Sequence, residues 1–136
     1  MLGSGHATAA CAVTGALSTT DISAALGNKW ACAKDGSDMW NERITAAPNG
    51  TFAECHSGQT SGPDPIDPAK GTFEIVGGKG DPDTITYTYP PSGGSYTYRV
   101  YAGSAPSTYT FCRPSDNKVY TVYITTCPPP QLNQCP

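Results

Sequence analysis

The stretch ITYTYPPSGGSYTYRVY, residues 85–101, constrains the fold of this chain more than any other. In most of it tyrosine alternates with threonine, arginine or valine, and a period of two places every second side chain on the same face of a β-strand. The two halves are separated by PPSGG, and its prolines and glycines are typical of a turn. The segment is therefore predicted to be a β-hairpin with cross-strand tyrosines on one face and threonines on the other.

The row of tyrosines has two possible positions in a folded protein. It can form the inner face of a barrel, with the phenol hydroxyls reaching the rim or buried polar partners. It can equally form an exposed aromatic face that binds a sugar, a peptide or another subunit. The alternation alone does not choose between them.

The same period of two continues through most of the chain, from residue 28 onward. It predicts eight strands, at about 28–33, 39–46, 51–55, 71–77, 83–89, 95–101, 108–113 and 118–126. The Asn49-Gly50 pair predicts a tight hairpin between the second and third strands. The proline-rich segment SGPDPIDPAKG, residues 61–71, is predicted to be an irregular crossing outside the sheet, because proline lacks the backbone donor. Such a segment is the natural place for a lid or a partner contact.

A single segment has the pattern of a helix, LSTTDISAALG at residues 17–27. Ser18 or Thr19 can cap its start, and Gly27 can end it. The length of 136 residues fits one domain. Because the strands must hide their edges, we predict an all-β fold, a small antiparallel up-and-down barrel of about eight strands with one short N-terminal helix. A two-sheet β-sandwich is the alternative.

The cysteines predict a disulfide-bonded protein, because their number is even and their spacing contains no C-x-x-C pair. They are Cys11, Cys32, Cys55, Cys112, Cys127 and Cys135. Disulfides imply an oxidising compartment, so we expect a secreted, periplasmic or cell-surface protein. Residues 11–136 are predicted to form a single disulfide-bonded domain, in which residues 127–136 are a proline-rich C-terminal strap.

Residues 1–10 are predicted to be a leader-like or extended segment, since Ala7-Thr8-Ala9 is similar to a signal-peptidase site. No apolar stretch reaches the ~20 residues of a membrane span, so no transmembrane segment is expected. The net charge of −3 and the scattered Lys and Arg residues argue against a nucleic-acid partner.

Candidate catalytic residues are few. His56 has Glu54 and Ser57 near it in sequence, but no G-x-S-x-G motif accompanies them. Carboxylate pairs for glycoside cleavage can be drawn from five acids, but the sequence does not give their separation: Asp35, Asp38, Glu42, Glu54 and Glu74. We therefore expect a protein that is not an enzyme and that has no cofactor or metal.

The order of several motifs resembles a group of small exported bacterial proteins of uncharacterised function. The motifs are LGNKWACA, MWNER, GPDPIDPAKGTFEIVG, DTITYTYPPSGGSYTYRVY and STYTFC. The resemblance implies a small lipocalin-like antiparallel barrel, and the helix before GNKW is similar to the entry of lipocalins, with one residue more than their G-x-W spacing. It also implies a disulfide between Cys32 and Cys112. Six cysteines allow 15 connectivities, and the simplest arrangement of the other four joins Cys11 to the strap and Cys55 to the remaining tail cysteine.

The predicted function is a binding or structural role at the cell exterior, carried by aromatic surface. The partner is a small ligand or a protein, including a second copy of the chain. The alternative is a subunit of an extracellular assembly ordered through its N-terminal segment, and a secreted hydrolase is the least favoured. The candidate contact residues are Trp30, Trp40, Tyr96, Tyr98 and Tyr101.

Overall fold

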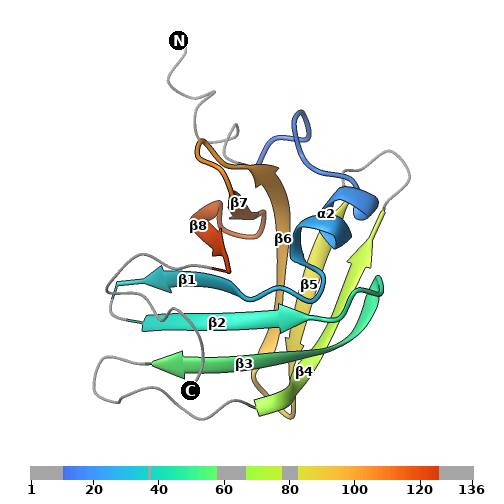
Figure 1. Ribbon diagram of the computed structural model, residues 1–136, viewed down its shortest axis with the longest axis vertical. Helices are drawn as coiled ribbons and strands as arrows, with labels where there is room; N and C mark the ends of the chain where they lie inside the picture. The colour runs from blue at the N-terminus through green and yellow to red at the C-terminus, as the bar shows by residue number, and fades with distance from the viewer. Residues whose placement is uncertain (1–10, 37, 58–66, 78–82, 126–136) are drawn as a thin grey trace.

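The computed structural model describes residues 11–36, 38–57, 67–77 and 83–125. Eight antiparallel strands form a closed barrel in the order of the chain (Figure 1). The strands are β1 (Ala31–Asp35), β2 (Asp38–Ile44), β3 (Asn49–Ser57), β4 (Asp67–Val76), β5 (Thr84–Tyr89), β6 (Gly94–Ala102), β7 (Thr108–Arg113) and β8 (Lys118–Ile124). The barrel closes between β1 and β8, where Ala31 pairs with Ile124 and Cys32 with Tyr123. The predicted all-β barrel is confirmed, and its closure excludes the two-sheet sandwich.

The predicted helix is also confirmed, as α2 (Thr19–Leu26). The Ser18 side chain caps it by accepting a hydrogen bond from the Asp21 backbone N–H, at 3.2 Å. Gly27 ends it. Ile22 and Leu26 are buried in the core and close one end of the barrel. No helix in the described part of the chain is long and apolar enough to span a membrane.

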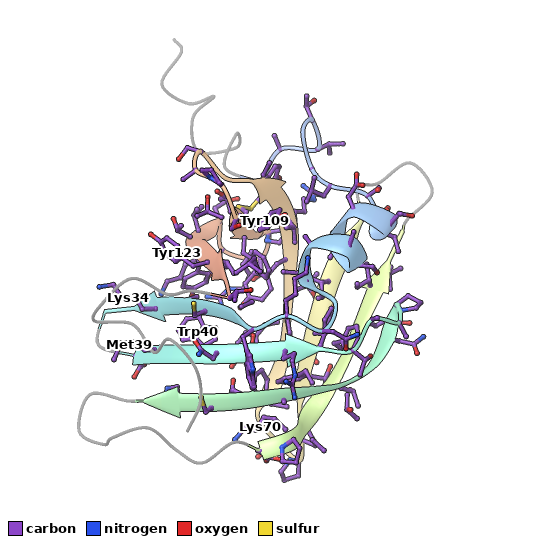
Figure 2. All side chains as sticks on the ribbon, viewed as in Figure 1. Lys34, Met39, Trp40, Lys70, Tyr109 and Tyr123 are labelled. Atoms are coloured by element: carbon purple, nitrogen blue, oxygen red, sulfur yellow. A yellow bond between two sulfur atoms is a disulfide. The ribbon has the colours of Figure 1, made fainter. Side chains whose placement is uncertain are left out.

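The barrel interior changes in character from one end to the other. Near α2 it is filled by apolar side chains without solvent exposure, such as Phe52, Ile85 and Val100. Toward the opposite end the inward positions are aromatic or charged. The stick view shows how densely side chains fill the space between the strands (Figure 2).

Four of the five tyrosines of the β5–β6 hairpin line the barrel interior, and this settles the alternative that the sequence left open for the row of tyrosines. They are Tyr87, Tyr89, Tyr96 and Tyr98. Tyr87 pairs with Tyr96 in register, and Ile85 with Tyr98. On the outer face, the Thr86 and Thr97 hydroxyls hydrogen-bond to each other at 2.7 Å. The alternation therefore produces the tyrosine row and the threonine row that were predicted.

The predicted hairpin turn at Asn49-Gly50 is wrong. Asn49 and Gly50 lie within β3, where they pair with Glu74 and Phe73 of β4, and the turn after β2 occupies residues 45–48. β3 is longer than β2, so its first residues extend past the end of β2 and pair only with β4. Gly50 has a φ of +151°, which explains the glycine without a turn.

The proline-rich crossing is shorter than predicted. Residues 67–71 belong to β4, including Pro68, and residues 61–66 of the predicted crossing lie outside the described part. The register between β3 and β4 shifts between Phe52 and Glu54. Such an irregularity at the start of a strand accommodates a residue that cannot donate to the ladder.

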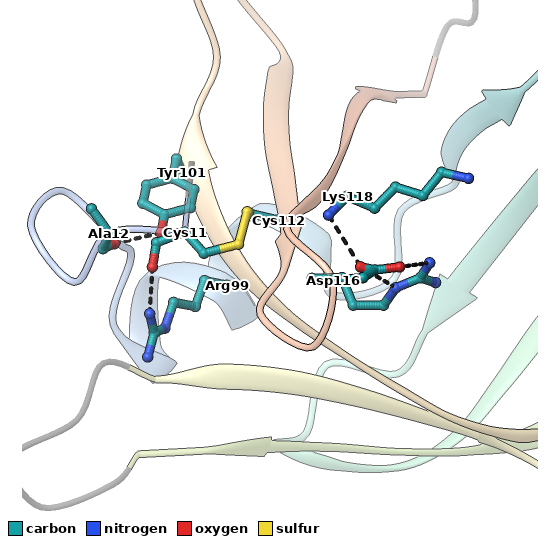
Figure 3. Close-up of a disulfide and its surroundings, with 8 residues drawn as sticks. Cys11, Ala12, Arg99, Tyr101, Cys112, Asp116 and Lys118 are labelled. Carbon is teal, nitrogen blue, oxygen red and sulfur yellow. Dashed lines mark hydrogen bonds and ion pairs between the residues drawn. A yellow bond between two sulfur atoms is a disulfide. The ribbon is translucent and has the colours of Figure 1, made fainter. Parts of the chain in front are cut away.

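The predicted bridge between Cys32 and Cys112 is wrong, because Cys112 is bonded to Cys11 (Figure 3). The same bond rules out the predicted bridge from Cys11 to the strap. Cys112 lies on β7, while Cys32 lies on β1, two strands away beyond β8. Two strand spacings of about 4.8 Å each exceed the ~7 Å limit between the Cα atoms of a disulfide.

The other cysteines agree with the prediction of an oxidised chain as far as they are described. Cys32 and Cys55 are disulfide-bonded, and no cysteine in the described ranges is free. Cys127, Cys135, the strap at 127–136 and the segment 1–10 lie outside the described residues. These bonds are compatible with an oxidising, extracellular location.

Candidate ligand-binding site

A cavity of about 480 Å³ lies in the barrel interior at the end opposite α2. The turns β1–β2, β5–β6 and β7–β8 surround this end (Figure 1). All eight strands contribute to its lining, through Asp35, Asp38, Trp40, Glu42, Glu54, His56, Lys70, Tyr87, Tyr89, Tyr96, Tyr98, Arg113 and Tyr120, with Pro90 and Gly93 from the β5–β6 turn. The volume falls within the range of about 300–1,000 Å³ that is common for small-molecule sites.

The aromatic side chains form one connected wall of the cavity. Trp40 contacts Tyr120 edge to face, with 5.6 Å between the ring centroids. Tyr120 contacts Tyr98 at 6.2 Å, and Tyr98 contacts Tyr87 at 6.2 Å. Edge-to-face contacts fix the rings against one another, so the wall is preformed. Figure 2 shows Trp40 on β2 at the barrel end that holds the cavity.

Two carboxyl groups face each other at the inner part of the cavity. Glu42 of β2 pairs in register with Glu54 of β3, and each side chain is only 8% exposed. The Tyr89 hydroxyl from β5 lies between them, hydrogen-bonded to Glu54 Oε2 at 2.9 Å and to Glu42 Oε2. A phenol has one proton, so it cannot donate fully to two carboxylates at once, and this arrangement favours a proton on one of the two carboxyl groups.

Glu42 is the carboxyl group whose burial favours the protonated form. Burial, and then the negative charge of Glu54, raises the pKa of Glu42 well above its usual value. The Glu54 carboxylate has a cation nearby, since Lys70 Nζ lies 4.0 Å from Glu54 Oε1. Burial and the two carboxyl groups also raise the pKa of Tyr89, which therefore stays neutral.

The remaining charged groups of the cavity are arranged in pairs near its opening. His56 Nε2 lies 3.8 Å from Asp38 Oδ1, and Lys118 Nζ lies 2.5 Å from Asp35 Oδ2. Arg113 binds Asp116 through two hydrogen bonds, at 2.8 and 3.1 Å. These bonds lower the pKa of the exposed Asp116 to about 2.

The predicted contact residues divide into two groups. Trp40, Tyr96 and Tyr98 line the cavity. Trp30 lies outside it under Arg43, whose guanidinium carbon is 4.7 Å from the ring centroid. Tyr101 is on the outer face of β6, where its hydroxyl donates to the Ala12 carbonyl (Figure 3). Binding by any of the five stays a prediction.

From the sequence, Glu42 and Glu54 were expected only as members of a larger set of acids. Four other residues of the lining were not predicted as site residues: Tyr89, Lys70, Arg113 and Tyr120. A usable signal was present for the two glutamates. Glu42 lies between Trp40 and Ile44 on one face of its strand, and Glu54 follows Phe52 on the corresponding face of the next. An acid on the inward phase of an otherwise apolar or aromatic strand face is unusual and typical of a polar function.

The cavity is chemically suited to hold a small molecule by aromatic contact and a few directed polar groups. Across the described residues, no three His, Cys, Asp or Glu side chains converge as a metal site requires. His56 has an acidic neighbour in Asp38, with 3.8 Å between His56 Nε2 and Asp38 Oδ1. In comparisons with known proteins, no protein-family model, no curated protein and no solved structure matches this chain.

Proposed function

We propose that this protein is a non-catalytic binding protein that holds one small organic molecule in the open end of its barrel. The observation that supports this function best is the 480 Å³ cavity, with its aromatic wall and its buried carboxyl pair. Binding sites for small molecules are typically concave, mostly apolar and equipped with a few convergent polar groups. We further propose that it acts in a secreted, periplasmic or cell-surface setting, where its disulfides are stable.

The closed barrel favours a small ligand over assembly by strand addition. A second chain adds a strand only where a sheet edge is unpaired. Each of the eight described strands is paired on both sides. An assembly ordered through residues 1–10 remains the alternative proposal, and it would have to use contacts other than an open edge of this barrel.

Glycoside hydrolysis is the second candidate, and the carboxyl pair is the observation that favours it. Both groups hydrogen-bond to the same hydroxyl, so their oxygens lie no further apart than about 5–6 Å. Retaining glycosidases hold their two carboxyl groups about 5–5.5 Å apart. We rank this candidate second because the Tyr89 hydroxyl occupies the place between the carboxyl groups where a glycosidic bond would have to lie.

Tryptophan fluorescence provides a direct test, because the chain has two tryptophans and only Trp40 lines the cavity. A Trp30→Phe variant reports on the cavity alone, and the matched Trp40→Phe variant reports on the outer wall alone. Both are titrated with a panel of neutral, cationic and anionic aromatic compounds of fewer than about 15 heavy atoms. We expect a saturable change in Trp30→Phe with at least one compound and none in Trp40→Phe.

Two results would contradict the proposed function. The first is a panel in which no compound changes the Trp40 signal, or in which the signal of Trp30 changes instead. The second is turnover of a panel of aryl glycosides or esters that is lost in Glu42→Gln or in His56→Ala, since this would make the cavity an active site.

A further inference from the structure

We infer that the molecule held in this cavity is a small organic cation, a primary amine on a compact apolar body, with its ammonium group bound by Glu42 and Glu54. This inference rests on the proposed function and adds the ligand class to it. It follows from the charge pairing, the shared proton and the aromatic wall.

The pairing of charges leaves one acid of the cavity without a base. Asp35 faces Lys118, Asp38 faces His56, and Glu54 faces Lys70. Glu42 takes part in none of the ion pairs formed by the described residues, although only 8% of it is exposed. Every base of the lining, in contrast, already has an acidic partner, Arg113 included. The Glu42 carboxyl group is therefore suited to bind a cationic ligand and not an anionic one.

The proton on Glu42 occupies the position that a ligand's positive charge would take. Around this carboxyl group the titratable neighbours are Glu54 on β3, Tyr89 and Tyr87 on β5, and Tyr98 on β6. Lys70 on β4 approaches from the far side of Glu54, and Asp38, His56, Arg113 and Tyr120 complete the lining on β2, β3, β7 and β8. No base from these strands forms an ion pair with Glu42 itself, so in the free protein a proton supplies the missing positive charge.

Binding then exchanges one positive charge for another. The O–H bond of the Glu42 carboxyl group breaks, and its proton leaves to solvent. The ligand's ammonium group keeps all its protons and donates N–H bonds to the carboxylates of Glu42 and Glu54. The net charge of the site changes by zero, so the exchange avoids burying an unpaired ion.

The aromatic wall suits the same ligand. Trp and Tyr rings attract cations placed over their faces, and they also cover an apolar body. Trp40, Tyr98 and Tyr120 belong to the connected wall beside Glu42. An amine with an aryl group two or three atoms from the nitrogen can place its ammonium group at the acid pair and its ring along this wall.

The test is titration calorimetry of the intact, oxidised protein with 2-phenylethylamine, and with the neutral 2-phenylethanol as its isosteric control. Measurement in phosphate and in HEPES, which differ in ionisation enthalpy and contain no primary amine, counts the protons released. We expect binding of the amine in preference to the alcohol, release of about one proton per ligand, and affinity that rises up to tenfold per pH unit while Glu42 is protonated in the free protein.

The variants assign the effect to the carboxyl pair. Glu42→Gln cannot release the proton, so we expect it to abolish proton release and to lower amine affinity about 10- to 100-fold, with little change for the alcohol. Glu54→Gln provides a second variant that should also weaken amine binding. Glu74→Gln, on the exposed outer face of β4, is the matched control and should change nothing.

Several outcomes would overturn the inference. Alcohol binding as tight as amine binding, without proton release, would refute the ligand class while leaving the proposed function in place. Stronger binding of 3-phenylpropionate than of the amine would do the same. Unchanged amine affinity in Glu42→Gln would refute the role of the acid pair. Failure of both probes to bind would refute this ligand class. The Trp40 fluorescence titration tests separately whether the cavity binds any small molecule.

Discussion

Glu42 occupies an inward position of β2 where an apolar side chain would be expected from its neighbours Trp40 and Ile44. Burial of a charged carboxylate there would cost several kcal/mol, so the site favours the neutral form of the group. Its pKa is higher in the folded chain than the 4.5 of an unperturbed glutamate. Its contribution to stability is therefore fully present below about pH 4.5 and is lost as the pH rises through the folded-state pKa.

A substitution of Glu42 tests this dependence of stability on pH. Glu42→Gln is neutral at every pH, so it should remove the loss of stability at high pH. We expect it to raise the Tm at pH 8 by roughly 3–5 °C, about 1 kcal/mol or more, and to leave the Tm at pH 4 nearly unchanged. Thermal melts at both pH values, beside those of Glu74→Gln, check it. An equal shift at the two pH values would show that Glu42 is not held neutral.

The second prediction concerns the hydroxyl between the two acids. Tyr89→Phe leaves two buried carboxyl groups without the bridging oxygen. We expect a loss of about 1–3 kcal/mol in the free energy of unfolding at pH 7, measured by urea titration. Tyr123→Phe, on the outer face of β8, is the control and should cost much less. Equal stability of Tyr89→Phe and the wild type would mean that the bridge contributes nothing.

At the scale of the elements, the alternation predicted the strands well, because half-buried strands of an antiparallel barrel repeat every two residues. It did not decide which face of the tyrosine hairpin is buried. The deciding feature lies in two apolar residues, Ile85 and Val100, which share the tyrosine phase and have no exposure in the structure. Apolar residues such as these indicate the inward face of a strand more reliably than tyrosines do, because tyrosine is common both in protein interiors and on protein surfaces.

The meeting of Glu42 and Glu54 could not be predicted, because it depends on register. A two-residue turn at Asn49-Gly50 would pair Pro48 with Thr51 and therefore place Glu42 opposite Ser57. The observed turn at residues 45–48 shifts the pairing by three residues and brings the two acids together. Register is set by turn geometry. The Asn49-Gly50 pair is the strongest short turn signal in the chain, but it does not form the turn, because Gly50 lies within β3 with a positive φ.

The disulfide between Cys11 and Cys112 is predicted to stabilise the folded chain. It links residues 101 positions apart, so in a chain-entropy view it should contribute roughly 2–5 kcal/mol. The double variant Cys11→Ser, Cys112→Ser should melt well below the wild type. Alkylation of the unfolded, unreduced Cys112→Ser protein should label a single thiol, at Cys11. Labelling of Cys32 instead would indicate that Cys112 is bonded to Cys32 in the wild type, which is the pairing that the resemblance implied.

At the scale of the whole molecule, the barrel has one sealed end and one open end. α2 and apolar side chains such as Ile22 and Phe52 seal the first, while aromatic and acidic side chains surround the cavity at the second. Paired edges all around the sheet leave the interior as the part of the described structure best suited to recognition. The cavity, and not the outer wall, is therefore the proposed binding site.

A crystal structure of the protein with bound 2-phenylethylamine tests this claim most directly, because it places the ligand without reference to any variant. We predict a single amine in the cavity, its ring along Trp40 and Tyr98 and its nitrogen about 2.7–3.2 Å from carboxyl oxygens of Glu42 and Glu54. An amine found on the outer wall, for instance beside Trp30 and Arg43, with the cavity holding only water, would contradict the account.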